Sequence, residues 1–185
     1  PVLRSALEGL EPVDLLMLAD RGRRVREVIL GAPLPADLAA EILDSYRALT
    51  TAGDPEPAVA VRSSATAEDL PEASFAGQQE SFLNVRGERD LLEAVHECYA
   101  SLFTDRAISY RAERGYDHFA VALSVGVQRM VRSDLACAGV LFTIDTEPGF
   151  PDVVLIDSSW GLGESVVKGR VDPDERAAAS AFRDG

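Results

Sequence analysis

The feature that most constrains this chain is a short apolar strand that ends on an arginine and a group of hydroxyl residues. Residues 58–61 read Ala-Val-Ala-Val, and Pro57 precedes this strand pattern while polar residues follow it. Arg62 comes next, accompanied by Ser63, Ser64 and Thr66. A second strand pattern occupies residues 81–85. The stretch from residue 58 to residue 85 therefore predicts two strands joined by a polar loop.

The residues after the first strand allow two interpretations. A guanidinium group matches the oxygens of a phosphate with paired donors, and small residues leave backbone N–H groups within reach of a ligand. Gly77, in the loop that follows, permits close approach of the backbone. Alternatively, Ser and Thr cap helices, Glu68 and Asp69 suit a first helical turn, and one of these acids pairs with Arg62. The sequence alone leaves both interpretations open.

Composition and charge exclude several classes of protein. The chain has 185 residues, 46% of them hydrophobic, which is enough for a core in one domain or two small lobes. Its formal net charge of -13 argues against a nucleic-acid or membrane-surface protein, because phosphate groups would be repelled. Cys98 and Cys137 lie too far apart for a metal-binding spacing. Without a long apolar run or a signal-peptide pattern, we expect a soluble cytoplasmic protein.

The order of patterns predicts a helical front followed by a mixed remainder. Apolar residues recur at helical spacing through the first fifty residues, and the Gly- and Pro-containing stretch 50–57 is the clearest loop. We therefore expect a helical subdomain over residues 1–54 and a second lobe over residues 55–185. In that lobe, residues 87–115 predict a long helical segment that Thr104 and Asp105 interrupt.

Three strand patterns follow the long helical segment, at residues 119–131, 136–143 and 152–157. Short turns separate them, and short connections favour antiparallel pairing. We therefore expect an α+β fold in which these three strands lie side by side in an antiparallel-rich sheet. Residues 177–185 are expected to form a frayed helix or a tail.

A second group of charged residues follows the third of these strands. Asp157 and Glu164 flank a glycine-containing turn, and Lys168 and Arg170 alternate along an expected further strand. Mg²⁺ prefers carboxylate oxygens, and the two cations suit the charge of a polyphosphate. Composition alone favours the alternative interpretation, a polar turn with surface ion pairs. The chain contains neither the P-loop pattern GxxxxGK[ST] nor GxGxxG after a strand, so neither common nucleotide fold is indicated.

Several longer segments resemble one enzyme family. Residues 61–71, VRSSATAEDLP, resemble the ATP-binding domain of the phosphoenolpyruvate synthase (pyruvate, water dikinase) family, to which pyruvate phosphate dikinase and rifampin phosphotransferase are related. The resemblance continues, in family order, through residues 73–85, 105–111, 126–133, 139–143 and 158–164. It implies that residues 55–185 form an ATP-grasp nucleotide-binding lobe that uses ATP and Mg²⁺.

The resemblance also implies roles for single residues. Arg62 and Arg170 would contact the phosphates as catalytic residues, and Asp157 or Glu164 would supply oxygens to Mg²⁺. Lys168 stands where the family commonly has glutamine, and an ammonium group suits phosphate better than a metal. The residues expected to bind the nucleotide are Arg62, Ser63, Ser64, Thr66, Gly77, Gln78, Gln128, Met130, Val131, Lys168 and Arg170, with Gln128, Met130 and Val131 around the adenine.

The family implies a reaction larger than this chain. Its members transfer phosphate from ATP to a histidine on a separate domain and then form phosphoenolpyruvate from pyruvate. The expected partners are a phosphohistidine swivel domain and a pyruvate/phosphoenolpyruvate-binding domain, and neither these nor the family's glycine-rich GGK segment is in this sequence. We therefore expect the ATP-binding portion of a dikinase, incomplete and inactive alone. The alternatives are the nucleotide domain of a rifampin-type antibiotic phosphotransferase and a non-catalytic nucleotide-binding or regulatory fragment.

Overall fold

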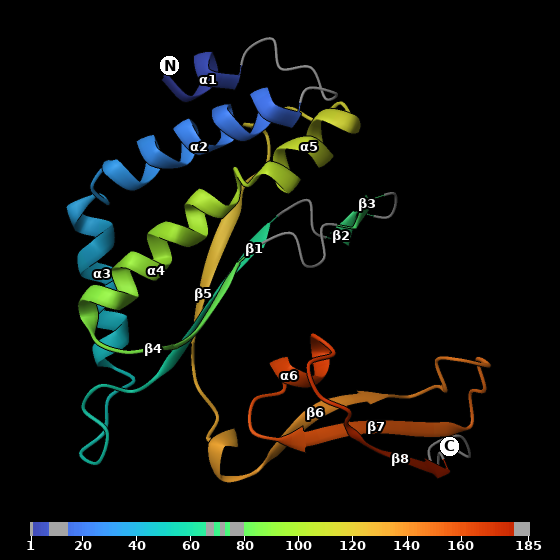
Figure 1. Ribbon diagram of the computed structural model, residues 1–185. Helices are drawn as coiled ribbons and strands as arrows, with labels where there is room; N and C mark the ends of the chain where they lie inside the picture. The colour runs from blue at the N-terminus through green and yellow to red at the C-terminus, as the bar shows by residue number, and fades with distance from the viewer. Residues whose placement is uncertain (1, 8–14, 66–68, 71–72, 75–79, 180–185) are drawn as a thin grey trace. The chain divides into compact units, whose positions relative to one another are not determined.

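The computed structural model describes residues 2–7, 15–65, 69–70, 73–74 and 80–179 (Figure 1). The chain divides into two compact units, residues 1–130 and residues 131–185, each of which packs mainly against itself. The boundary expected near residue 54 separates a helical segment from strands, whereas the boundary at residue 130 separates two compact units. The expected boundary therefore stays a prediction. No helix in the described part of the chain is long and apolar enough to cross a membrane.

The first unit begins with the helical segment that the sequence predicts. Its elements are α1 (Val2–Leu7), α2 (Leu15–Gly31) and α3 (Ala36–Arg47) before the first strand, then α4 (Glu88–Ser101) and α5 (Asp105–Glu113). The predicted interruption between α4 and α5 is confirmed. Thr104 causes it, because its side-chain oxygen accepts a hydrogen bond from the Ala107 N–H at 3.3 Å and so caps a new helix.

The first sheet has the order β4–β1–β5, with all described pairs antiparallel. Its strands are β1 (Val59–Ala65) in the centre, β4 (Ser81–Val85) and β5 (Leu123–Arg129). Two short strands, β2 (Asp69–Leu70) and β3 (Ala73–Ser74), pair only with each other. Both strands that the sequence predicts between residues 58 and 85 are therefore confirmed as β1 and β4.

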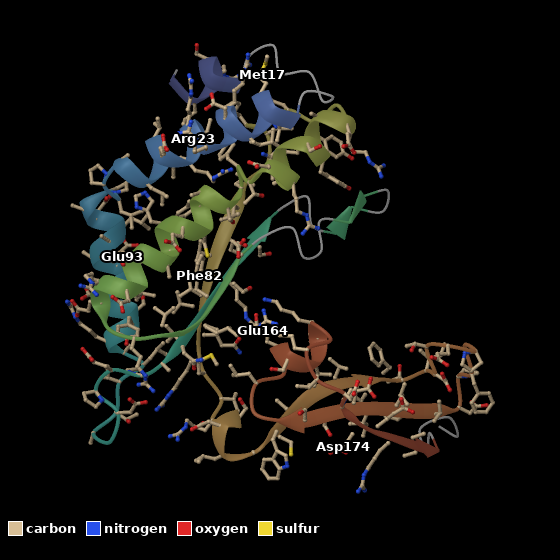
Figure 2. All side chains as sticks on the ribbon, viewed as in Figure 1. Met17, Arg23, Phe82, Glu93, Glu164 and Asp174 are labelled. Carbon is tan, nitrogen blue, oxygen red and sulfur yellow. The ribbon has the colours of Figure 1, made fainter. Side chains whose placement is uncertain are left out.

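The core of the first unit lies between this sheet and α4. Val59 and Val61 of β1 and Leu91 of α4 are fully buried, and Phe82 of β4, labelled in Figure 2, packs against the same cluster. Tyr46 of α3 closes one end, since its hydroxyl donates to the Pro57 carbonyl at 3.0 Å and accepts from the Gly87 N–H at 3.0 Å. Helix α4 thus packs against one face of the sheet.

The second unit contains a sheet of order β6–β7–β8, also antiparallel. Its elements are a 3₁₀ turn (Ser133–Leu135), β6 (Cys137–Phe142), β7 (Val153–Trp160), the short α6 (Glu164–Val167) and β8 (Asp174–Ala179). Helices and antiparallel sheets together confirm the α+β class.

Of the three consecutive strands expected to lie side by side, the second and third do pair antiparallel, as β6 and β7, but the first does not join them. β5 pairs with β1 along seven residues, and β6 pairs with β7. The reason is burial: Val125 and Val127 of β5 pack against the core formed by β1 and α4. A strand with this apolar face gains more from that core than from pairing with the next strand in the chain.

Two further expectations near the C-terminus are also wrong. Of residues 177–185, expected to form a frayed helix or a tail, residues 177–179 instead end β8, which pairs with β7, and residues 180–185 lie outside the described residues. Lys168 and Arg170 do not lie on a strand but end α6. The N–H groups of Lys168 and Arg170 donate to the Glu164 and Ser165 carbonyls at 2.9 Å each, and Gly169, with φ of +60°, makes the turn.

Candidate functional site

One face of the β4–β1–β5 sheet is polar and exposed. Alternate residues of a strand point to opposite faces, and Val61, Val125 and Val127 point toward α4. The residues between them therefore point away from the helices, and they are exposed. We call this surface the polar face and define it by Arg62, Ser64, Ser81, Ser124, Gly126 and Gln128.

The strand register fixes which members of the polar face are neighbours. Arg62 on the central strand lies opposite Ser81 of β4 and opposite Gly126 of β5. Ser64 lies opposite Ser124, whose hydroxyl donates to the Ser64 carbonyl at 3.2 Å. Gln128 pairs with Ala60 and is a diagonal neighbour of Arg62, within about 7–8 Å for such positions. The register thus brings together three residues that the resemblance assigns to the nucleotide: Arg62, Ser64 and Gln128.

Among the described residues, Arg62 has Ser81 and Gly126 opposite it in the strand register, with Ser124 and Gln128 on the diagonals. Within the described side chains, no ion pair involves Arg62. The competing interpretation, that Arg62 pairs with Glu68 or Asp69, falls on side chains outside those described. A guanidinium on an exposed sheet face is suited to an anionic ligand, because its planar N–H donors match the oxygens of a phosphate.

Other expected nucleotide residues lie elsewhere. Ser63 points to the core side of β1, opposite Val125, and its hydroxyl donates to the Glu80 carbonyl at 3.3 Å. Met130 follows β5, and its N–H donates to the Ala58 carbonyl at 2.8 Å. Val131 is 81% exposed and begins the second unit. Thr66, Gly77 and Gln78 lie outside the described residues.

In the second unit, α6 brings together one carboxylate and two cations. Glu164 begins the helix, Lys168 follows one turn later, and their side chains form an ion pair (Figure 2 labels Glu164). Hydrogen bonding to Lys168 lowers the pKa of Glu164, and the charges of Lys168 and Arg170 contribute further in the same direction. Glu164 is therefore an ionised group that already has a cationic partner.

Asp157 of β7 is the better candidate for a metal ligand. Its Oδ1 atom is buried without a hydrogen-bond partner, whereas Glu164 is engaged by Lys168. Glu175 of β8 lies directly opposite Asp157 in the strand register, so the two carboxylates share one face of the sheet. A divalent cation would satisfy the orphaned oxygen and relieve the facing negative charges, so this donor set fits Mg²⁺. In the described part of the chain, no group of three or more typical metal ligands is present.

The sequence interpretation missed four residues of these surfaces. Ser81, Ser124 and Gly126 belong to the polar face only because of the register between strands, which a pattern within one strand cannot supply. Glu175 was missed because residues near it were assigned to a tail rather than to a strand facing β7. The sequence did contain one signal for Gly126. It lies inside the Leu123–Arg129 strand pattern, and strand interiors disfavour glycine.

Comparison with known proteins agrees with the resemblance found in the sequence. The family model described as pyruvate phosphate dikinase, AMP/ATP-binding domain, matches residues 2–181. Phosphoenolpyruvate synthase of Helicobacter pylori is 56% identical over 170 residues, which cover 91% of this chain and 21% of that protein. The protein of the same name from Escherichia coli is 59% identical over 162 residues, 88% of this chain and 20% of the relative.

A third phosphoenolpyruvate synthase, from Synechocystis, is 56% identical over 178 residues, 94% of this chain and 22% of the relative. The chain thus spans about a fifth of the length of these curated relatives. The similarity covers both compact units, because the matched range runs from α1 to β8.

Proposed function

The chain belongs to the family of the pyruvate phosphate dikinase AMP/ATP-binding domain, and we propose that it binds ATP with the phosphates against the polar face. The observation that carries this proposal is the register that gathers Arg62, Ser64 and Gln128 on one exposed face. Arg62 would contact the phosphates, and the part of the polar face around Gln128 would lie nearer the adenine. This assignment gives the domain an ATP-grasp type of binding, with residues 55–185 as its nucleotide-binding lobe.

The physical basis for the phosphate assignment is electrostatic. The chain carries a formal net charge of -13, so a polyphosphate is repelled by most of the surface and is attracted only by local groups of cations. Arg62 supplies such a charge together with paired N–H donors, and the hydroxyls of Ser64, Ser81 and Ser124 are suitable secondary donors. A charge-assisted contact of this kind contributes about 1.5–3 kcal/mol to binding.

For the second unit, taken by itself, we propose Asp157 as a Mg²⁺ ligand, with Glu164 held by Lys168, and Lys168 and Arg170 as phosphate-contacting cations. Mg²⁺ supplies charge neutralisation to a nucleotide polyphosphate. Asp157→Asn should weaken binding of Mn²⁺, used as a spectroscopic substitute, while Glu164→Gln should have a smaller effect. Equal losses from both substitutions would contradict the assignment to Asp157.

The complete reaction is proposed by family analogy. The relatives are named phosphoenolpyruvate synthase, and in that reaction the phosphate of ATP passes to a histidine on a separate domain and then to pyruvate. A phosphohistidine domain and a pyruvate-binding domain are accordingly the proposed partners. A cytoplasmic location is part of the same proposal, because ATP is required.

The test is a pair of substitutions at Arg62 with a matched control. Arg62→Ala should weaken ATP binding by roughly ten- to a hundred-fold, the equivalent of one charge-assisted contact. Arg62→Lys should recover only part of the affinity, because ammonium keeps the charge and loses the planar fork. Arg86→Ala is the control: Arg86 follows β4, and its guanidinium donates to the Glu56 carbonyl at 2.7 Å.

Calorimetric titration with ATP and Mg²⁺, together with thermal unfolding of each variant, gives both readouts. The control should alter the melting temperature alone. If Arg62→Ala lowers the melting temperature and leaves the ATP dissociation constant unchanged, Arg62 belongs to a structural ion pair and the proposed function of the polar face is wrong.

A further inference from the structure

Gly126 is a glycine in the middle of a strand, and the usual structural reasons for such a glycine do not apply to it. Its φ is not positive, since the positive-φ glycines are Gly87, Gly115, Gly149, Gly161 and Gly169. It does not mark a bulge either, because β1 and β5 pair without a register shift from Val59↔Arg129 to Ala65↔Leu123. Glycine weakens a strand, so another cause is required at this position.

Close packing is not that cause. Of the described atoms, a Cβ atom built on Gly126 would meet only the carbonyl oxygen of Arg62, at 3.9 Å, which is ordinary van der Waals contact. Gly139 of β6 shows the opposite situation: a Cβ there would lie 1.9 Å from the carbonyl oxygen of Asp157. Gly139 is thus required by its neighbouring strand, whereas no described atom occupies the space beside Gly126 more closely than van der Waals contact.

The position of this space is informative. Gly126 lies directly opposite Arg62 in the register and on the same face of the sheet. Side chains of directly opposed residues stand about 4.5–5.5 Å apart at Cβ, so any side chain at position 126 would stand beside the Arg62 stem and reach the guanidinium. The absence of a side chain leaves one flank of Arg62 accessible to a ligand.

We propose that Gly126 is a specificity-determining residue that keeps the polyphosphate path to Arg62 open. The ligand class is the phosphate chain of a nucleoside triphosphate, because the group exposed at this point is a guanidinium flanked by the hydroxyls of Ser81 and Ser124. The inference rests on the proposed function, since it places the phosphates at Arg62. It adds that the choice of ligand depends on the absence of a side chain at position 126 as well as on the Arg62 guanidinium beside it.

The experiment uses the 185-residue chain with Gly126→Ala, Gly126→Val, Arg62→Ala and the Arg62→Ala/Gly126→Val double variant. Gly31→Ala is the control, because no described atom lies within 4 Å of a Cβ built on Gly31, which has no positive φ either. Dissociation constants are measured for ATP, AMP and inorganic tripolyphosphate, and thermal unfolding is recorded for each variant. Alanine and valine both favour a strand more than glycine does, so neither substitution at position 126 should lower the melting temperature.

We expect Gly126→Val to weaken ATP and tripolyphosphate alike, by about tenfold and by no more than the loss in Arg62→Ala. Gly126→Ala should weaken both by less, and Gly31→Ala should change neither. AMP should lose less than ATP. In the Arg62→Ala background, Gly126→Val should produce no further loss, because the two residues act on one contact.

Two results overturn the inference alone: a normal ATP affinity of Gly126→Val while Arg62→Ala binds weakly, or an equal loss from Gly126→Val with and without Arg62. A loss for ATP without a loss for tripolyphosphate would place the nucleoside at this point and would also overturn it. Normal ATP affinity of Arg62→Ala, or no ATP binding by the unsubstituted chain, overturns the proposed function and the inference together.

Discussion

The two three-stranded sheets of this protein have the same strand pairing and very different burial. The central strand of β4–β1–β5 contributes Val59 and Val61 to the core, both fully buried. In the described part of residues 131–185, the only buried residue is Ser133, and Leu141 and Trp160 are 57% and 75% exposed. The first sheet is therefore stabilised by side-chain burial, whereas the second depends mainly on its backbone ladder and close strand approach.

This difference explains why each sheet offers a different kind of site. A sheet held by helices on one face can leave the other face polar, and the polar face around Arg62 is the result. The second sheet instead offers its strand ends and α6, where Glu164, Lys168 and Arg170 meet. Substitutions should therefore affect stability in the two sheets by different mechanisms.

The largest expected effect is that of Gly139→Ala in the second sheet. The new Cβ would lie 1.9 Å from the Asp157 carbonyl oxygen and 2.7 Å from the Ser158 Cα, both backbone atoms that cannot rotate away. We expect the β6–β7 pairing to be disrupted at a cost of about 3 kcal/mol or more, the upper end for overpacking. Amide hydrogen exchange should show lost protection in β6 and β7, with β1 and α4 unaffected. Normal protection in Gly139→Ala would contradict the close approach of these strands.

A second prediction compares apolar truncations in the two sheets. Val61→Ala removes fully buried methyl groups and should cost roughly 2 kcal/mol of unfolding free energy. Leu141→Ala removes a larger side chain that is 57% exposed, and it should cost less than about 0.5 kcal/mol. Urea unfolding, with amide hydrogen exchange as the readout, measures each loss of unfolding free energy and shows in which compact unit it occurs. A large loss of unfolding free energy in Leu141→Ala would show that the second sheet buries this face. The two sheets would then not differ in how they are stabilised.

The sequence predicted the parts of this fold that depend on local periodicity. The helices of the front, the break at Thr104 and the strands β1 and β4 follow from patterns within each segment. It failed where pairing is long-range: β5 pairs with β1 because of Val125 and Val127, which no local pattern reveals. For the candidate site, the sequence named Arg62, Ser64 and Gln128, but their common face and the neighbours Ser81, Ser124 and Gly126 required the register.

A third prediction concerns pH, which should affect the first unit and leave the second unchanged. Arg111 is fully buried, its Nε donates to His118 Nδ1 at 3.1 Å, and a second N–H donates to the Leu102 carbonyl at 2.6 Å. Burial and the charge of Arg111 lower the pKa of His118, against a smaller opposing effect of Asp117. His118 must be neutral at Nδ1 to accept this hydrogen bond.

The sign follows from proton linkage. The unfolded chain binds a proton at His118 below about pH 6.5, while the folded chain resists it, so stability should fall as the pH drops below that value. The loss should be smaller than that of Val61→Ala. Unfolding by urea at pH 7.5, 6.5 and 5.5, roughly spanning the histidine titration, measures it. His118→Gln keeps an acceptor without this titration and should reduce the pH dependence; an unchanged slope would assign the effect to other groups.

A further small effect is expected from Asp54→Asn, which removes two ion pairs at the edge of the first sheet. One carboxylate oxygen of Asp54 lies 3.2 Å from an Arg129 guanidinium nitrogen, and the other lies 3.7 Å from one of Arg86. The side chain of Asp54 is 34% exposed and those of both arginines are more exposed, so solvent screens these contacts and they contribute about 0–1 kcal/mol. If the buried core holds the ends of β4 and β5, Asp54→Asn should lower the unfolding free energy by less than Val61→Ala and leave the ATP dissociation constant unchanged. Raising the salt concentration should reduce the difference from the unsubstituted chain. A loss as large as that of Val61→Ala would mean that charge pairing rather than burial positions these strands. Side-chain burial would then not be what distinguishes the first sheet from the second.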